Sequence, residues 1–451
     1  MLHRIVLPAL AVAASLLASA QASAETIAQA LAAAYSYNPE INSARAGTRA
    51  TDEGVPIARS GNRPTISAVG TVSGVHTEIL GQSEFLRSGS LGVEITQNLF
   101  RGFRTRNAIR GAQTDVLASR ELLTNTVQNT LFDAAQAYMD VLRDTAILDI
   151  RRRNVSFLQE QSRAANDRFN VGENTRTDVA QTRARLAVAQ SGVALAVSNL
   201  TISRSFYRQI IGHDPSNLRP DFPYARLVPA QLTHAIEASQ TQHPAIRAAI
   251  FQQDSAAFNV KEIEGELLPT VSLSGAVERQ FDFNESESTP SASIVGRVSI
   301  PIYQGGAVAA RVRQAKELLG QRQIEIDLTR DQVRASVVAA WSQVEAAREA
   351  IEAAGSGIES ADVVLSGVQE EQRVGQRTTL DVLNAQQELL DAREVLIVAQ
   401  RDRVVANFAL LASMGRLTAE QLSLGVDVYH PEQHYEAVAD KWFGLRTPDG
   451  R

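Results

Sequence analysis

LPTVSLSGAVERQFDFNESESTPSASIVGRVSIPI, at residues 268–302, contains two segments in which apolar and polar residues alternate. The apolar positions of the first segment are Val271, Leu273, Gly275, Val277, Phe281 and Phe283. Those of the second are Ala292, Ile294, Gly296, Val298, Ile300 and Ile302. This alternation predicts two strands, 269–283 and 291–302, each with one apolar and one polar face, joined by a polar loop at 282–290. Each strand has the roughly 9–11 residues that a tilted membrane strand needs.

The landmarks around this stretch also occur earlier in the chain, which predicts a tandem repeat. LPTVS at 268–272 repeats RPTIS at 63–67 with an offset of 205 residues. The Val-Gly pair at 374–375 repeats the pair at 171–172 with an offset of 203 residues. Two copies of one unit are therefore expected, and the first copy has its own strands and polar loop. The expected segments are repeat 1 at 25–230, with strands at 64–77 and 88–100 and a loop at 78–88, repeat 2 at 231–426, and a polar tail at 427–451.

Long stretches without proline separate the strand regions, between Pro64 and Pro215 and between Pro301 and Pro431. Apolar residues recur there every seven positions, as in Val127, Ala134, Val141, Leu148 and Val155, or Val337, Val344, Ile351, Ile358 and Leu365. A heptad repeat predicts long helices with coiled-coil packing. The expected helices are 104–169, 175–211, 306–372 and 378–414. The longer ones would reach about 100 Å at 1.5 Å per residue, which is too long for a globular core.

The N-terminus indicates export. His3 and Arg4 precede an apolar run, and Ala22-Ser23-Ala24 offers a small-residue cleavage site, so residues 1–24 are predicted to be a signal peptide. No other segment is judged apolar enough to cross a bilayer as a helix, which leaves the periplasm, secretion or an outer-membrane β-barrel. The absence of cysteine excludes disulfides and thiol chemistry.

The composition points away from several other classes of function. A net charge of −6 does not suggest nucleic-acid binding. The sequence has no phosphate-binding loop, zinc-protease motif or recognisable nucleophile–base pair, so neither an enzyme nor a cofactor is expected. His430 and His434 have metal-ligand spacing, but Pro431 lies between them and no third ligand is evident, so no metal is expected.

Four strands cannot close a membrane barrel, because the smallest such barrels have about eight. Every backbone polar group in a bilayer must be paired, so several chains would have to share one barrel. Two, three or four chains would supply 8, 12 or 16 strands, and the periodicity does not choose among these numbers. The polar strand face would line a water-filled lumen.

The order of these features resembles the TolC family of outer-membrane efflux proteins. The resemblance rests on the two repeats together with PIYQGG at 301–306 and RVGQRTTLDV at 373–382. It implies a mixed α and β membrane protein. This would be a trimer with a twelve-stranded outer-membrane β-barrel, four strands per chain, and a long periplasmic coiled-coil helical barrel.

The resemblance also implies a function and partners. The protein would be the passive exit duct of a tripartite efflux or type I secretion system, in contact with outer-membrane lipid. It would receive drugs or secreted proteins from an inner-membrane ABC or RND-type transporter through a periplasmic adaptor. The alternatives are an exported coiled-coil stalk or adhesin, which leaves the paired amphipathic hairpins unexplained, and a periplasmic adaptor, whose lipoyl-like and barrel modules are missing.

Two turns join the long helices, and both carry helix-capping residues. Gly172 and Gly375 are suited to helix ends, and threonines three residues before Asp178 and Asp381 form capping-box patterns. Capping alone would explain these residues. The resemblance implies in addition a periplasmic gate, in which Arg377 bonds to the Thr177–Asp178 region.

The same resemblance implies that Asp381 contributes to a ring of carboxylates, one per chain, at the pore constriction. Such a ring would favour cations. Gln372 and Asn384 depart from the family pattern, which places a tyrosine and a second aspartate at these positions. The gate and the cation preference are therefore expected to be weaker here.

Overall fold

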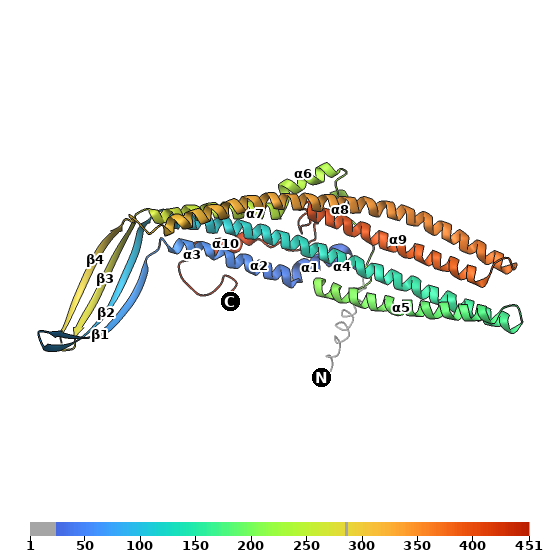
Figure 1. Cartoon of the computed structure of the whole chain (residues 1–451), viewed down its shortest axis with the longest axis horizontal. Coiled ribbons are helices and arrows are strands. Elements are labelled where there is room, and N and C mark those ends of the chain that lie inside the picture. The colour runs from blue at the N-terminus through green and yellow to red at the C-terminus, as the bar shows by residue number, and fades with distance from the viewer. Residues whose placement is uncertain (1–23, 285–286, 451) are drawn as a thin grey trace, which may run out of the picture. The chain divides into compact units, whose positions relative to one another are not determined.

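The computed structural model describes residues 24–284 and 287–450, and the predicted signal peptide lies outside them except for Ala24. Within this part of the chain there are ten α-helices and four strands, which form one antiparallel sheet (Figure 1). The prediction of a mixed α and β protein with four strands per chain is confirmed. The chain divides into two compact units, and the two longest helices run through both of them.

The sheet belongs to the second unit, which comprises residues 39–127, 236–336 and 427–451. Its strands are β1 (Thr65–Ile79), β2 (Gln82–Arg101), β3 (Thr270–Asp282) and β4 (Glu287–Ser299), paired in that order. The register places Leu91 opposite Gly70 and Arg279, and Val93 opposite Ala68 and Val277. Apolar residues of neighbouring strands therefore share one face, while hydroxyl pairs such as Thr71–Ser90, at 2.8 Å, mark the other.

The first hairpin differs from the prediction of a polar loop at 78–88. β1 continues to Ile79 and β2 begins at Gln82, so the turn consists of Leu80 and Gly81, both with positive φ. β4 likewise begins at Glu287 rather than at 291. The polar side chains misled the prediction, because the backbone ladder pairs N–H and C=O groups whatever the side chains are.

The long helices are α4 (Arg104–Asn170), α5 (Arg176–Ile211), α8 (Ala307–Arg373) and α9 (Thr379–Ser413). α4 and α8 each have 67 residues, which corresponds to about 100 Å at 1.5 Å per residue. The heptad positions pack inside the first unit, where a cluster of Leu365, Val382, Ala385 and Leu389 joins α8 to α9. The coiled-coil spacing thus places the apolar seam between paired helices.

α5 corrects the expectation that no segment after the signal peptide is apolar enough to cross a bilayer. It passes that test by length and composition, with a mean hydropathy of 1.4 over its best window, of which only 17% is buried. Between Arg185 and Arg204 the helix carries no charged residue. Its alanine and valine content raises the hydropathy while leaving small side chains on an exposed helix.

The N-terminal segment is fastened to the linker between the repeats, within the first unit. α1 (Ile27–Tyr37) begins with a capping box at Thr26. The buried Tyr138 hydroxyl lies 2.8 Å from the carbonyl oxygens of Glu25 and Arg219 and accepts from the Arg219 N–H at 2.9 Å. The Tyr207 hydroxyl donates to the Glu25 carboxylate at 2.7 Å. One aromatic pair therefore ties residue 25 to the linker, which contains the short 3-10 turn η1 (Ala225–Leu227).

The second unit also contains shorter helices that surround the sheet junction and the first part of α4. These are α2 (Pro39–Asp52), α3 (Gly54–Ser60), α7 (Pro244–Glu264), the 3-10 turn η2 (Gly265–Leu267) and α10 (Pro431–Val438). α6 (Leu232–Gln242) precedes α7, and the boundary lies at His243-Pro244 because proline disfavours the helical conformation in the residue before it.

The C-terminal segment is more than the polar tail expected at 427–451. It contains α10, and the adjoining Ala439 packs in a cluster with Val55 and Val116. His434 Nδ1 lies 2.8 Å from an oxygen of the fully buried Asp52. His434 therefore takes part in a hydrogen bond that holds the tail on α2. The prediction missed this docking because the apolar contacts are few and come from distant parts of the sequence.

Candidate functional site at the helix tips

The first tip joins α4 to α5 through a tight turn. Gly172 has φ +87°, which ends α4, and the Glu173 N–H donates to the Arg168 carbonyl at 2.8 Å. The Thr175 hydroxyl accepts from the Asp178 N–H, and the Asp178 carboxylate accepts from the Thr175 N–H at 3.0 Å. This is the predicted capping box, in which the Asp178 carboxylate helps to cap the N-terminus of α5. Thr177 is exposed on the first turn of α5.

The second tip repeats this geometry between α8 and α9. Gly375 has φ +80°, and the Asp381 carboxylate accepts from the Thr378 N–H at 2.9 Å and from its hydroxyl at 2.8 Å. These hydrogen bonds hold the pKa of Asp381 below its usual value, and the bond from the Thr378 backbone N–H makes the largest contribution. Asp381 is therefore a charged, half-buried carboxylate at the helix N-terminus, where the helix dipole also favours it.

Arg377 does not lie on the Thr177–Asp178 region in this chain. Its Nε donates to the Glu371 carboxylate at 2.8 Å, across the turn that Gly375 makes. That hydrogen bond raises the pKa of the Arg377 guanidinium. The pair is exposed, and its intrachain role is to close the second tip on itself.

A different contact links the two helix pairs close to their tips. Arg185 of α5 donates through Nη2 to the Asn384 side-chain oxygen of α9 at 2.8 Å. Gln372, at the position where a tyrosine was expected, donates to Thr379 at 3.2 Å and stays within its own tip. The two family-pattern departures thus have defined partners, and Asn384 takes part in the link between the repeats.

Sequence reasoning missed Arg185 and Glu371. Glu371 lies only six residues before Arg377, and the turn at Gly375 is a signal that could have paired them. Arg185 and Asn384 are 199 residues apart, and α5 carries nothing that distinguishes Arg185 from other helix-surface arginines.

Further from the tips, α4 and α9 are joined by buried or half-buried charged groups. Arg151 of α4 binds Glu394 of α9 through two hydrogen bonds, at 2.6 and 3.0 Å, and also donates to the Gly192 carbonyl of α5. The hydrogen bond to Glu394 raises the pKa of the Arg151 guanidinium. Arg401 of α9 similarly binds Asp140 of α4 at 2.9 Å. The two-pronged Arg151–Glu394 pair fixes both distance and angle, so it helps to set the register of α4 against α9.

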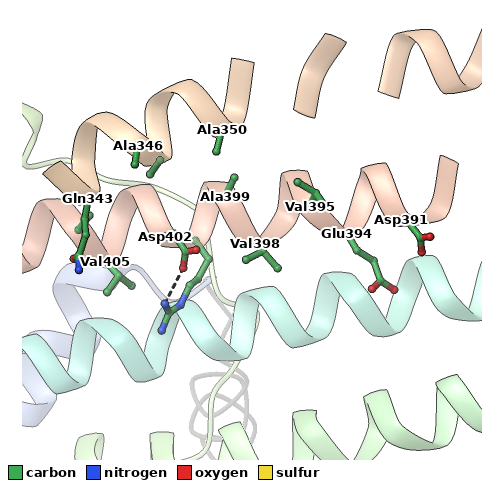
Figure 2. Close-up of a pocket in the computed structure, with 13 residues that line it drawn as sticks. Gln343, Ala346, Ala350, Asp391, Glu394, Val395, Val398, Ala399, Asp402 and Val405 are labelled. Carbon is green, nitrogen blue, oxygen red and sulfur yellow. Dashed lines mark hydrogen bonds and ion pairs between the residues drawn. The ribbon is translucent and has the colours of Figure 1, made fainter. Parts of the chain in front are cut away.

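A groove of about 840 Å³ lies between α8 and α9 (Figure 2). Ala346 and Ala350 form one wall, and Val395 and Val398 contribute apolar surface from the other. Asp391, Glu394, Arg401 and Asp402 also line the groove, but Asp402 pairs with Arg401 at 2.9 Å and Glu394 is bound by Arg151, so Asp391 is the lining carboxylate without an arginine partner among the described residues. The small residues leave room for another helix to approach closely, because helix spacing depends on side-chain size.

The other repeat has a groove in the equivalent place between α4 and α5, with a volume of about 380 Å³. Its α4 wall is polar, with Asp133, Asp140 and Asp144, whereas Ile202 and Phe206 of α5 are apolar and exposed. Arg143 also lines this groove and pairs with Asp140 and Asp144, so both helix pairs offer a groove that carries arginine–carboxylate pairs.

The sequence of this chain matches the family described as outer membrane efflux protein twice, over residues 30–213 and 235–416, once in each predicted repeat. It is 44% identical to outer membrane efflux protein BepC of Brucella suis biovar 1 (strain 1330), over 99% of this chain and 98% of that protein. It is 24% identical to outer membrane protein TolC of Escherichia coli (strain K12), over 90% and 85% of the two chains.

Among solved structures, the Campylobacter jejuni CmeC outer membrane channel has a TM-score of 0.78 with this chain. The superposition covers 92% of this chain and 89% of that one at 16% sequence identity. At this identity the likeness concerns the fold, which is the same combination of long helices and strands.

Proposed function

Since this chain belongs to the outer membrane efflux protein family and is an outer-membrane channel protein, we propose that three copies share one twelve-stranded β-barrel and conduct export substrates passively. The long helices lie in the periplasm and lengthen the same duct. No catalytic role is proposed, because the family consists of channels.

The observation that carries this proposal is the open sheet. In the described part of the chain, β1 and β4 each pair with one strand only, so each leaves an edge of unpaired N–H and C=O groups. Such edges are too costly in a bilayer, where no water can satisfy them. The edge of β4 in one copy would therefore pair with the edge of β1 in the next.

A second feature supports assembly from several copies. Val188, Leu195 and Ile202 lie seven residues apart on α5 and are 69%, 58% and 52% exposed. We call these three residues the α5 stripe. A heptad row of this kind normally packs against another helix, and within one chain this row has little cover. A neighbouring copy of the chain would bury it.

The partners follow from the chain's lack of any visible energy source. An inner-membrane ABC or RND-type transporter would drive export, and a periplasmic adaptor would connect it to this channel. The groove between α8 and α9 suits an adaptor hairpin, because its alanine wall admits a helix and Asp391 at its edge would attract a basic side chain (Figure 2). The substrates would be drugs or secreted proteins.

The helix tips would form the periplasmic gate. Within its own chain Arg377 is bonded to Glu371 and not to the first tip. The gate contact would therefore form between neighbouring copies, with Arg377 of one copy binding Thr177 and Asp178 of the next. Asp381 would supply one carboxylate per copy to a ring at the constriction. Gly172 and Gly375 shape the turns, and the Arg185–Asn384 bond would hold the two helix pairs of one chain together.

Outer-membrane fractionation combined with planar-bilayer recording tests the function. The detergent-purified protein is expected in the outer-membrane fraction, and it should insert into a bilayer and give discrete, cation-preferring conductance steps. A coiled-coil stalk or adhesin would give no conductance. Protein that stays soluble without detergent, or that never conducts, would refute the shared barrel.

A further inference from the structure

A pocket of about 620 Å³ lies in the second unit, where the sheet meets the helices. β2 ends at Arg101 directly before the pocket residues Gly102 and Phe103, and only Pro269 separates the pocket residues Leu267 and Leu268 from β3. The pocket therefore lies at the inner ends of two membrane strands. Because the helices are periplasmic, this level corresponds to the headgroups of the inner leaflet of the outer membrane.

Two glycines build the pocket by bringing two backbone segments into contact. A Cβ on Gly102 would lie 2.1 Å from the Gly265 carbonyl oxygen, and a Cβ on Gly265 would lie 2.3 Å from the Gly102 carbonyl oxygen. Neither position tolerates a side chain without backbone movement. The contact between the Gly102 and Gly265 backbones therefore fixes this end of the pocket.

The pocket combines apolar walls with an excess of positive charge. Phe103 and Leu267 are 54% and 52% exposed, although both would be expected to seek apolar surroundings. Lys261, Arg313 and Lys316 also line the pocket, against Glu264 as the one lining carboxylate. Lys261 and Lys316 are two of only three lysines in the whole sequence.

The cations are only partly neutralised by the protein. Lys316 Nζ lies 2.9 Å from the Glu264 carboxylate. Lys261 Nζ lies 5.6 Å from the centre of the Phe258 ring, and among the described residues neither Lys261 nor Arg313 has a carboxylate within ion-pair distance. Two cationic groups thus remain available beside an apolar surface.

We propose that this pocket binds the phosphate headgroup of an anionic phospholipid from the periplasmic leaflet. Lysine and arginine side chains at a membrane surface attract anionic lipid, and pockets that combine basic and apolar residues suit a headgroup with its attached chains. The exposed Leu273 and Val277 continue along β3 and offer a path for an acyl chain. The bound lipid would anchor the sheet–helix junction at a set depth. This inference rests on the proposed placement of the sheet in the membrane.

The test uses native mass spectrometry of the detergent-purified full-length protein with added dioleoyl-phosphatidylglycerol, and dioleoyl-phosphatidylcholine as the neutral comparison. The wild-type protein should prefer phosphatidylglycerol. The triple variant Lys261→Gln/Arg313→Gln/Lys316→Gln should bind it about tenfold or more weakly, since each cation contributes to attraction of the anionic headgroup. Arg322→Gln, an exposed cation further along α8 that pairs with Glu325, is the matched control and should bind as the wild type does.

Several outcomes would overturn the proposal. These are equal binding of the two lipids by the wild type, undiminished phosphatidylglycerol binding by the triple variant, or displacement of the lipid by inorganic phosphate at equal concentration. The last result would indicate a free-anion site. A change in the number of associated copies without loss of lipid preference would assign the pocket to contacts between subunits instead.

Two further variants keep the test decisive if the triple variant does not fold. Lys261→Gln removes a cation that has no carboxylate partner among the described residues, and this single substitution should be enough to weaken phosphatidylglycerol binding. The charge-conserving Lys261→Arg/Lys316→Arg should retain the lipid preference. Bilayer conductance separates this inference from the channel function, because the pocket variants should still conduct if the barrel is correct.

Discussion

α5 and α9 are equivalent helices of the two repeats, yet they have different surroundings. α5 has no charged residue between Arg185 and Arg204, and its stripe of Val188, Leu195 and Ile202 is exposed. The counterparts of the stripe in α9 are Asp391, Val398 and Val405, which line the groove against α8, as Ile202 of the stripe lines the groove against α4. α9 is also bonded to α4 through Glu394 and Arg401. The difference teaches that the two repeats share the helix pair but use it differently, since α9 braces α4 within the chain and α5 presents an exposed apolar stripe.

The largest expected effect comes from placing charge in the α5 stripe. Leu195→Glu/Ile202→Glu should convert the oligomer to single chains, because carboxylates buried without partners in an apolar contact cost several kcal/mol. Native mass spectrometry of the detergent-purified protein measures the change. Gln190→Glu, on another face of α5, should leave the oligomer intact. Intact oligomers of the double variant would show that the stripe is not an intersubunit contact.

Next in size is the brace that α9 makes with α4. Glu394→Gln removes the charge that Arg151 binds twice, and we expect the free energy of unfolding to fall by about 1–3 kcal/mol. Thermal unfolding in detergent, followed by circular dichroism, would show the lower midpoint. Glu388→Gln, at an exposed position of the same helix, serves as the control. If both variants melt together with the wild type, the brace contributes nothing to stability.

The contacts at the tips should have smaller effects, measurable as conductance. Exposed polar contacts contribute about 0.2–1 kcal/mol, which shifts an open–closed equilibrium by about 1.4- to 5-fold. Arg185→Ala, Arg377→Ala and Asp178→Ala should each raise single-channel conductance in planar bilayers. Arg183→Ala breaks a 3.0 Å bond to Asn166 inside one helix pair and should not. Unchanged conductance in a variant would remove that residue from the gate.

The smallest effect concerns the cap of α9 and its pH dependence. The pKa of Asp381 is lowered by its hydrogen bonds to Thr378, so the folded tip favours the charged form. The charged carboxylate therefore stabilises the tip fully above pH 3.8, the ordinary pKa of aspartate. This stabilisation is lost as the pH falls through the lower pKa that Asp381 has in the folded protein.

Hydrogen exchange of the α9 first-turn amides, corrected for the intrinsic rate, should accelerate below pH 3.8. In Asp381→Asn this step should disappear, because the amide does not titrate in this range. Exchange rates without a step in the wild-type protein would contradict the role of the charged cap.

Much of the fold could be predicted from the sequence because it depends on local periodicity. Strand alternation around Val277 and the heptads of α4 and α8 each follow from a repeat of two or seven residues. The capping boxes at Thr175 and Thr378 span three residues and are equally local. The ends of the strands were less predictable, since the ladder at Ile79 and Gln82 continues through polar residues.

The contacts of the candidate site were predicted less well, for a physical reason. Arg185 and Asn384 meet only because two helix pairs pack in one particular register, and neither residue carries a sign of that partner. Arg377 had a nearer carboxylate in Glu371, and proximity along the chain made that pair form within the tip. Resemblance to a family can therefore predict which residue types occur at a turn. It does not predict their side-chain partners, which depend on the neighbouring residues of this chain.

The Tyr138 hydroxyl has a consequence for the order of events during export. It joins Glu25 to Arg219, and so its bonds cannot all form until the polypeptide has crossed the inner membrane as far as residue 219 of 451. Nearly half of the chain must therefore be translocated before its beginning is fastened.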